Sequence, residues 1–424
     1  MTGFDSEQQY LRELANRSPL PEGFSAATAT LDFTSLERDQ TLSMNLALIL
    51  LDEPASGFAG LFTKNRFCGA PITIGRGRMQ EPLLRGILIN NRVANVGACG
   101  GVEDAEQLCT SLGDRIGEPG SRILPASTGV VGWKLPVQSM KSALPELVDS
   151  LQRKSILPVA RAIMTTDSYP KVHREQVGEG CIVGIVKGAG MIEPNMGTML
   201  AFLLTDIGMQ REQLRRCLRR CAGNTFNRIS VDGDQSTSDM AVVLSSAKRP
   251  AIGEKAFEQA LEKVCARLAE DVVRNGEGVG HVIRVTVRGA PLQRIAAEAG
   301  KAVVNSPLVK TAVFGNDPNV GRIVAALGDF ADAADFPLDL ERLRVCLGGV
   351  EIFAGGSFRL DADKESQLNR YMSEGALDPA QRGYPSHYRQ VVLEIDLGAG
   401  TEKAEVLGSD LSYQYVKENA DYRS

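Results

Sequence analysis

Thr198 lies near the middle of the chain, in the segment KGAGMIEPNMGTML that spans residues 187–200. A threonine hydroxyl is a weak nucleophile unless a base adjoins it, and one solution uses the threonine's own α-amine as that base. An internal threonine has no free amine. If Thr198 is the nucleophile, the chain must first cut itself between Gly197 and Thr198. Gly197 suits such a cut, because a residue without a side chain can adopt backbone conformations that others cannot.

A hydroxyl that attacks a carbonyl also needs donors for the oxygen that becomes negative. The segment STGVVG at residues 127–132 offers the Thr128 hydroxyl and the backbone N–H of Gly129, on a loop that follows a predicted strand. These two groups are a candidate oxyanion hole. The alternative interpretation is a tight turn that simply requires glycine.

Two charged residues have positions that favour contact with a substrate. Lys187 closes an apolar run and precedes Thr198 by eleven residues, so it can bind a carboxylate, although many lysines at strand ends are merely solvated. Glu277 falls in a predicted helix-to-strand turn, where a rigid scaffold can aim its side chain.

The sequence predicts neither a metal nor a nucleotide cofactor. Residues 226–239 resemble a calcium loop only superficially, because the glycine and glutamate that this geometry needs are missing, and a hydrogen-bonded turn that supports the nucleophile fits better. The eight cysteines and three histidines lack metal-ligand spacing, and the glycine-rich stretches lack a dinucleotide fingerprint.

The elements that must position these residues follow from apolar patterning. Short continuous apolar runs have strand length and predict burial on both faces. These strands are expected at 46–51, 86–90, 122–125 and 181–186, with helices at 102–112 and 140–151. In the second half, a helical period predicts one helix over 254–274, and alternation predicts a strand over 282–287.

No linker divides the chain, so both halves are expected to share one core. A cut before Thr198 would leave an α chain, residues 1–197, and a β chain, residues 198–424, held together by packing. The net charge of −5 argues against nucleic-acid binding, and the arginines of residues 214–220 are expected on a solvated helix face. No apolar stretch is long enough to span a membrane, and without a signal-like N-terminus we expect a cytoplasmic protein.

Together these motifs resemble the ornithine acetyltransferases, or glutamate N-acetyltransferases, of arginine biosynthesis. The resemblance rests on the 187–200 segment, on STGVVG at 127–132, on FNRISVDGD at 226–234, on FGNDPNVGRI at 314–323 and on the ending YVKENADYRS. The resemblance runs along most of the chain, with the five motifs in the family's order.

The resemblance implies self-cleavage before Thr198 and an α2β2 assembly. Thr198 would take an acetyl group from N2-acetylornithine and pass it to glutamate, and some family members also use acetyl-CoA. Thr128 and Gly129 fall on the family's oxyanion pair. The positions implied to contact the amino-acid substrate are Thr165, Lys187, Thr198, Glu277, Asn419 and Ser424. The implied fold is a four-layer α/β/β/α sandwich with mixed sheets.

Two stretches depart from the family pattern. After Glu277 the chain reads GVGH, where the family usually has GATK, and residues 90–101 blur an early family motif. Two alternatives therefore stay open. The chain could acylate a different amino acid in a specialised pathway, or it could be a related self-cleaving aminopeptidase or amidase that passes the acyl group to water.

Overall fold

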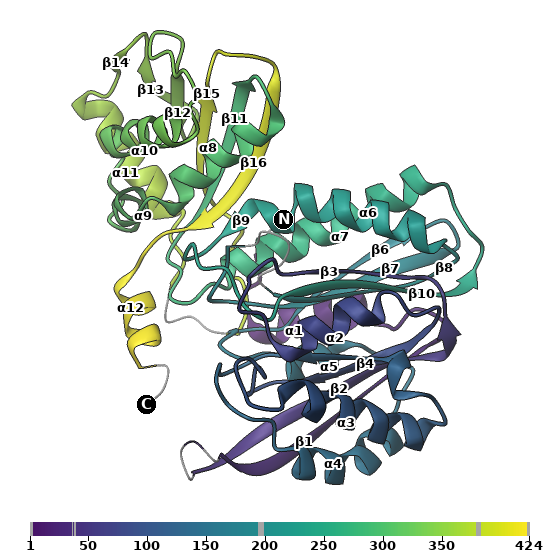
Figure 1. The fold of residues 1–424 in the computed structure, drawn as a ribbon. Helices are drawn as coiled ribbons and strands as arrows, with labels where there is room; N and C mark the ends of the chain where they lie inside the picture. The colour runs from purple at the N-terminus through teal and green to yellow at the C-terminus, as the bar shows by residue number, and fades with distance from the viewer. Residues whose placement is uncertain (1–2, 36, 38–39, 194–198, 379–382, 422–424) are drawn as a thin grey trace.

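The computed structural model describes residues 3–35, 37, 40–193, 199–378 and 383–421 (Figure 1). Most of the chain before residue 282 forms a sandwich of two β-sheets with helices on both outer faces. Within the described residues, no helix is both long and apolar enough to cross a membrane.

The first sheet has four strands in the order β1-β2-β4-β5. They are β1 (Phe24–Ser35), β2 (Gln40–Ala55), β4 (Leu84–Asn90) and β5 (Ile123–Ser127). The outer face is covered by α3 (Gly101–Ile116) and α4 (Val137–Asp149). In β2, Leu48 and Leu50 face these helices while Ile49 and Leu51 face the second sheet, so the predicted burial on both faces is confirmed.

The second sheet has five strands in the order β3-β10-β8-β7-β6. They are β3 (Phe58–Phe62), β10 (Met240–Arg249), β8 (Leu200–Ile207), β7 (Gly180–Lys187) and β6 (Lys171–Val177). Its outer face packs on α6 (Arg211–Asn224) and α7 (Glu254–Arg274). The predicted four-layer α/β/β/α sandwich is confirmed, and α7 has the predicted bounds because its apolar stripe is continuous.

The space between the two sheets holds one large apolar cluster, to which three short helices contribute. They are α1 (Glu7–Arg17), α2 (Ala70–Arg78) and α5 (Leu157–Ala162). Single 3-10 turns, Gly120–Arg122 and Phe226–Arg228, precede β5 and β9.

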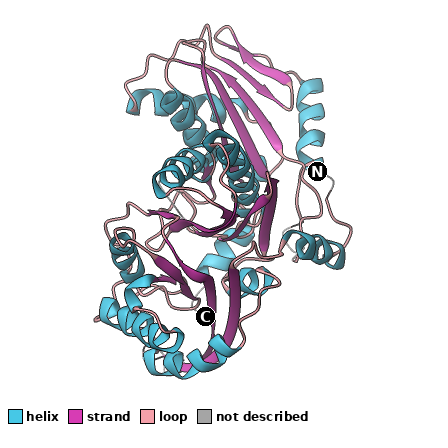
Figure 2. Cartoon of the chain, turned by 90° about the vertical axis from the view of Figure 1, so that its right-hand side faces the viewer, coloured by secondary structure: helices cyan, strands magenta, loops and turns pink. Residues whose placement is uncertain are grey.

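The structure has a second module, of which the sequence predicted only the strand at 282–287. It is a seven-stranded sheet, β14-β13-β12-β15-β11-β16-β9, with its own apolar cluster (Figure 2). Its strands are β9 (Ile229–Ser230), β11 (Val282–Ala290), β12 (Arg344–Leu347), β13 (Val350–Ala354), β14 (Ser357–Phe358), β15 (Val391–Asp396) and β16 (Glu402–Ser409). Its helices are α8 (Gln293–Asn305), α9 (Pro307–Phe314), α10 (Val320–Ala333) and α11 (Ala362–Glu374). This apolar cluster is separate from those of the sandwich. Residues from before and after position 198 still pack together in the sandwich, where β7 pairs with β8.

The last helix leaves the second module and returns toward the sandwich. Figure 1 shows the chain running from β16 into α12 (Tyr413–Ala420), which stands apart from the seven-stranded sheet. Ser412 begins α12 by accepting a hydrogen bond from the N–H of Tyr415 and donating its own hydroxyl to the carbonyl of Gly278. The C-terminal segment is thereby fastened beside Glu277.

Candidate active site

One cavity of about 270 Å³ collects six residues that the sequence singled out. Thr128, Gly129, Thr165, Lys187, Glu277 and Asn419 all line it. The remaining lining comes from the ends of β8 and β10 and the loops around them: Ala94, Val130, Val131, Thr166, Gly190, Met191, Met199, Leu200, Ser236, Thr237, Ser238 and Asp239.

Thr198, Gly197 and Ser424 lie outside the described residues. The chain on each side of the first two is described: β7 ends at Lys187, β8 begins at Leu200, and Met199 lines the cavity. The roles predicted for Thr198, Gly197 and Ser424 therefore stay predictions.

The Thr128–Gly129 loop is held by the strand next to it. The N–H of Thr128 donates to Asn90 at 3.0 Å, and the N–H of Val130 donates to Arg92 at 2.9 Å. Gly129 has φ +129, and a Cβ there would lie 2.1 Å from the carbonyl carbon of Arg92, so no other residue fits. The turn explains the glycine, but it does not require a hydroxyl at Thr128, which faces the cavity.

Lys187 directs this hydroxyl. Its Nζ donates to Thr128 Oγ1 at 3.2 Å, which leaves the threonine's own proton free to donate elsewhere. Behind Lys187, the buried carboxylate of Asp167 accepts hydrogen bonds from Lys171 and from the N–H of Gly188. Burial would raise the pKa of Asp167, but Lys171 and Lys187 hold that pKa well below its usual value. The Asp167 carboxylate stays ionised and holds the chain at Lys171 and at Gly188 in place.

Glu277 lies in the helix-to-strand turn where it was predicted. Its N–H donates to Ala189, and its carboxylate accepts a hydrogen bond from Asn419 Nδ2 at 2.8 Å. Burial raises the pKa of Glu277, while Thr166 and Asn419 oppose the rise through hydrogen bonds. A Cβ on Gly190 would lie 2.3 Å from this carboxylate, so the glycine makes room for it.

The 226–239 segment forms the hydrogen-bonded turn that was expected. Asp232 accepts hydrogen bonds from the N–H groups of Met191 and Ile192 at 2.6 and 2.8 Å. Tyr415 of α12 donates to the same carboxylate at 3.3 Å. Asp232 therefore ties the loop before residue 198 to the C-terminal helix.

Two residues missed in the sequence, and one from the predicted 226–239 turn, complete the surroundings. Asp167 and Lys171 form a fully buried ion pair, and Asp239 lines the cavity with a side chain that is also buried. Asp167 and Lys171 are four residues apart in no recognisable motif. Their burial is decided by distant elements, so the sequence gives no sign of it.

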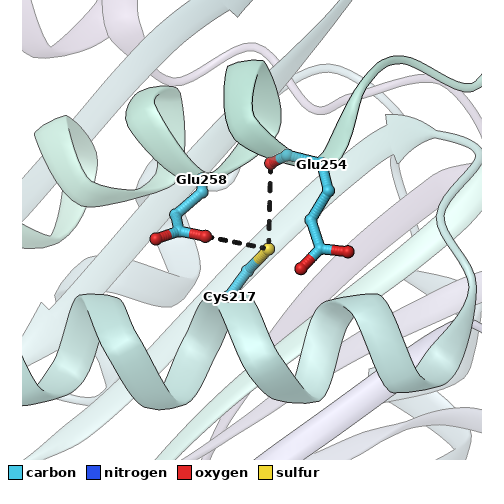
Figure 3. Close-up of side chains that lie close together, drawn as sticks. All are labelled: Cys217, Glu254 and Glu258. Atoms are coloured by element: carbon cyan, nitrogen blue, oxygen red, sulfur yellow. Dashed lines mark hydrogen bonds between the residues drawn. The ribbon is translucent and has the colours of Figure 1, made fainter.

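The one metal-compatible cluster among the described residues lies on the outer helices, away from the cavity lining. It joins Cys217 of α6 to Glu254 and Glu258 of α7 (Figure 3). Arg216 and Arg220 pair with these carboxylates, and burial with the nearby acids raises the pKa of Cys217 to about 11. The cluster is an ion-pair network, as expected for arginines on a solvated helix face.

The two departures from the family pattern have different positions. Asn90 accepts a hydrogen bond from Ser127 and Arg92 accepts one from Val130, so the first stretch supports the Thr128–Gly129 loop, and its Ala94 lines the cavity. His281 is buried and pairs with Asp410 at 2.8 Å. Val279, Gly280 and His281 do not line the cavity, although Val279 borders a smaller one of about 50 Å³.

Comparison with known proteins decides the family. The family model described as ArgJ family matches residues 32–424. The chain belongs to the ArgJ family. Relatives named arginine biosynthesis bifunctional protein ArgJ are 40% identical in Nitratidesulfovibrio vulgaris, over 96% of this chain and 100% of that one, and 37% identical in Methylococcus capsulatus, over 95% of each.

Solved structures of ArgJ proteins match parts of the chain. One from Bacillus halodurans is 32% identical over 53% of this chain and 100% of its own, with a TM-score of 0.47. The ornithine acetyltransferase of Mycobacterium tuberculosis, complexed with ornithine, is 24% identical over 43% of this chain and 96% of its own, with a TM-score of 0.35. The resemblance drawn from five motifs is confirmed at the level of the family.

Proposed function

We propose that this ArgJ protein cuts itself between Gly197 and Thr198 and then transfers an acetyl group from N2-acetylornithine to glutamate. The observation that carries this proposal is the single cavity lined by Thr128, Gly129, Lys187 and Glu277, beside the residue that follows Thr198. These groups come from separate segments of the chain, and each has a role in acyl transfer between amino acids.

In the first half-reaction, the freed α-amine of Thr198 takes the proton of the threonine hydroxyl. Oγ attacks the acetyl carbonyl carbon, and the carbonyl oxygen becomes negative. The Thr128 hydroxyl and the Gly129 N–H stabilise this oxygen by donating hydrogen bonds to it. Lys187 already donates to Thr128 Oγ1, so the threonine's own proton is free for this bond. The C–N bond then breaks, and the ornithine nitrogen leaves with the proton held by the α-amine.

In the second half-reaction, the α-amine of glutamate attacks the acetyl ester. The ester C–O bond breaks, and Thr198 Oγ recovers a proton as acetylglutamate leaves. Lys187 is suited to the substrate carboxylate and Glu277 to an ammonium group, with Asn419 orienting Glu277. Thr165 lines the same wall, and Ser424 is proposed to contact the substrate as well.

The proposal extends to assembly and location. We infer that residues 1–197 and 198–424 stay together as an αβ unit, that two units form an α2β2 heterotetramer, and that the enzyme works in the cytoplasm without a cofactor. The family membership supports these points. Light scattering of the purified protein tests the assembly.

Intact-mass analysis before and after addition of N2-acetylornithine tests the reaction. We expect two chains, with an acetyl adduct on the one that begins at Thr198, and acetylglutamate once glutamate is added. A single uncut chain in active material, or full activity of Thr198→Ala, would contradict the proposal. Acetate as the only product would indicate the amidase alternative, and acetyl-CoA in place of acetylornithine tests the second donor.

An acceptor panel tests the remaining alternative, a member that acylates another amino acid. The GVGH departure that motivated it does not line the main cavity. We therefore expect glutamate to be preferred over ornithine homologues and other amino acids. An amino acid that accepts the acetyl group better than glutamate would favour a role in a specialised pathway.

A further inference from the structure

Asp239 is a buried acid in the cavity to which the proposed transfer reaction gives no role. It directly precedes β10 and is only 3% exposed. Its Oδ2 has no hydrogen-bond partner among the described residues, although the side chain lines the cavity. A buried carboxyl oxygen without a partner is costly to keep, so its position calls for a chemical reason.

The backbone holds Asp239 close to residue 198. β10 and β8 pair in parallel, with Met240 opposite Leu200, and the N–H of Met240 donates to the carbonyl of Met199 at 3.0 Å. Ser236 and the backbone of Met199 lie close enough to the Asp239 carboxyl to lower its pKa. Asp239 therefore lies beside Met199, the residue that directly follows the proposed nucleophile in the sequence.

The charges around Asp239 favour a proton on it. Burial raises the pKa of Asp239 well above its usual value, and Ser236, Lys187 and Met199 offset only part of that rise. Lys187 of β7 and Glu277 are the other charged side chains among the described residues that line the cavity. An acid of this kind is a stronger base, once ionised, than an ordinary carboxylate.

Self-cleavage needs such a group. Before the cut, residue 198 has no free α-amine, so the base of the transfer reaction does not yet exist. Another group must take the hydroxyl proton and supply a proton to the amide nitrogen. Lys187 is engaged with Thr128, and Glu277 with Asn419.

We propose that Asp239 is the proton carrier of self-cleavage, an inference that rests on the proposed function. The ionised carboxylate takes the proton of the Thr198 hydroxyl, and Oγ attacks the carbonyl carbon of Gly197. The C–N bond between Gly197 and Thr198 breaks as Asp239 returns the proton to the nitrogen. Water then hydrolyses the resulting ester, which releases the carboxylate of Gly197 and restores the Thr198 hydroxyl.

Asp239→Asn and Asp239→Glu test the proposal in freshly synthesised full-length chains. The fraction cut is followed by intact mass over time and at several pH values. In the natural protein the rate should rise with pH as Asp239 ionises and then level off. Asp239→Asn should cut about 10²-fold more slowly without that rise, and Asp239→Glu should retain the rise.

Asp206→Asn is the matched control. Asp206 is a buried carboxylate on β8 of the same sheet, it accepts the N–H of Cys181 at 2.8 Å, and it does not line the cavity. This variant should cut at the normal rate. Each Asp239 variant is also made in the Thr198→Ala background, where melting temperatures of uncut chains show whether the fold survives.

The outcomes separate the two proposals. A natural chain that is never cut would overturn self-cleavage itself and Asp239's role with it. A natural chain that is cut, with Asp239→Asn cut equally fast and with the same pH dependence, would overturn the role of Asp239 alone. The role would likewise be wrong if both Asp239 variants lower the melting temperature strongly and neither is cut, since that pattern indicates a structural acid.

Discussion

The hydroxyl of Thr128 is a residue-scale feature on which the rate should depend strongly. Thr128→Ala keeps the Gly129 turn but removes one oxyanion donor, so we expect kcat to fall by about 10²–10³-fold with a smaller change in KM. Steady-state kinetics of acetyl transfer measure both constants. Thr128→Ser, which keeps the hydroxyl, is the control and should retain most of the activity, and equal losses in both variants would contradict the role.

Gly190 offers a test of Glu277 that leaves the carboxylate itself unchanged. A Cβ at Gly190 would lie 2.3 Å from the Glu277 carboxylate, so Gly190→Ala must displace it. Loss of one charge-assisted contact of about 1.5–3 kcal/mol should raise KM for the amino-acid substrate by roughly 10–100-fold.

Gly328→Ala is the control for that variant, because nothing lies within 4 Å of its added carbon on α10. It should leave the kinetics unchanged. If Gly190→Ala binds substrate normally, Glu277 does not hold the ammonium.

Residue types and spacing predicted Thr128, Lys187 and Glu277 because each has a chemical use next to an element boundary. Asp167 gave no such signal, and Asp239 was predicted only as part of the 226–239 turn. Their properties come from burial and from Lys187 and Lys171, which other strands bring to them. Sequence motifs thus found the groups that would touch a substrate and missed those that tune them.

At the scale of elements, Gly278 governs the attachment of α12. It has φ +61, and a Cβ there would lie 2.2 Å from the nitrogen of Tyr415. Gly278→Ala should detach α12 and withdraw Asn419 from Glu277, lowering activity while the sandwich stays folded. Hydrogen exchange should show faster exchange in α12 and unchanged protection in β7 and β8.

Gly349→Ala is the control for Gly278→Ala, because it introduces backbone strain at a positive φ without a steric clash. Gly349 has φ +80 in the β12–β13 turn, with nothing within 4 Å of an added Cβ. This control should lose about 1–2 kcal/mol from strain alone and keep its activity. An undisturbed α12 in Gly278→Ala would show that the helix is not anchored there.

Continuous apolar runs and the long helical period predicted the sandwich elements well. Most of the second module escaped prediction for a topological reason. Its strands β12, β13 and β14 have only two to five residues, and β9 pairs with β16 across more than 170 positions of sequence. Short strands with distant partners have little periodic signal.

At the scale of the whole molecule, the two chains of a cut protein should remain together. β7 and β8 are antiparallel neighbours, paired from Ile182 with Thr205 to Lys187 with Leu200. We expect cut material to elute as one species on a sizing column and to separate only in denaturant. Uncut Thr198→Ala is the reference, and dissociation of cut chains in native buffer would contradict the shared sheet.

Lys310 ties α9 to β16 and to the residue after β9, and it should make stability depend on pH. Its buried Nζ donates to the carbonyl of Val231 at 2.7 Å and also to that of Ser409. Burial lowers the pKa of Lys310 from 10.5 to about 8, although Asp410 and Asp232 oppose this. Between pH 8 and 10.5 the unfolded chain therefore holds a proton that the native protein has lost, so stability rises with pH in that window.

Chemical denaturation of the natural protein and of Lys310→Met across this range measures the effect. At about 1.4 kcal/mol for each pH unit, the rise from Lys310 amounts to about 3 kcal/mol, and it should be absent in the variant. Parallel pH curves for the two proteins would show that Lys310 keeps an ordinary pKa.

The hairpin-like pairing of β7 with β8 also fixes what a break between them would do. Each fresh end would be tethered to a strand whose neighbour carries the other end, so the two could not diffuse apart and would meet at a high effective concentration. The two ends would stay close together, and they would remain separate only because a carboxylate and an amine do not spontaneously re-form a peptide bond in water. A protein built this way can open its backbone beside its substrate cavity without giving up its architecture.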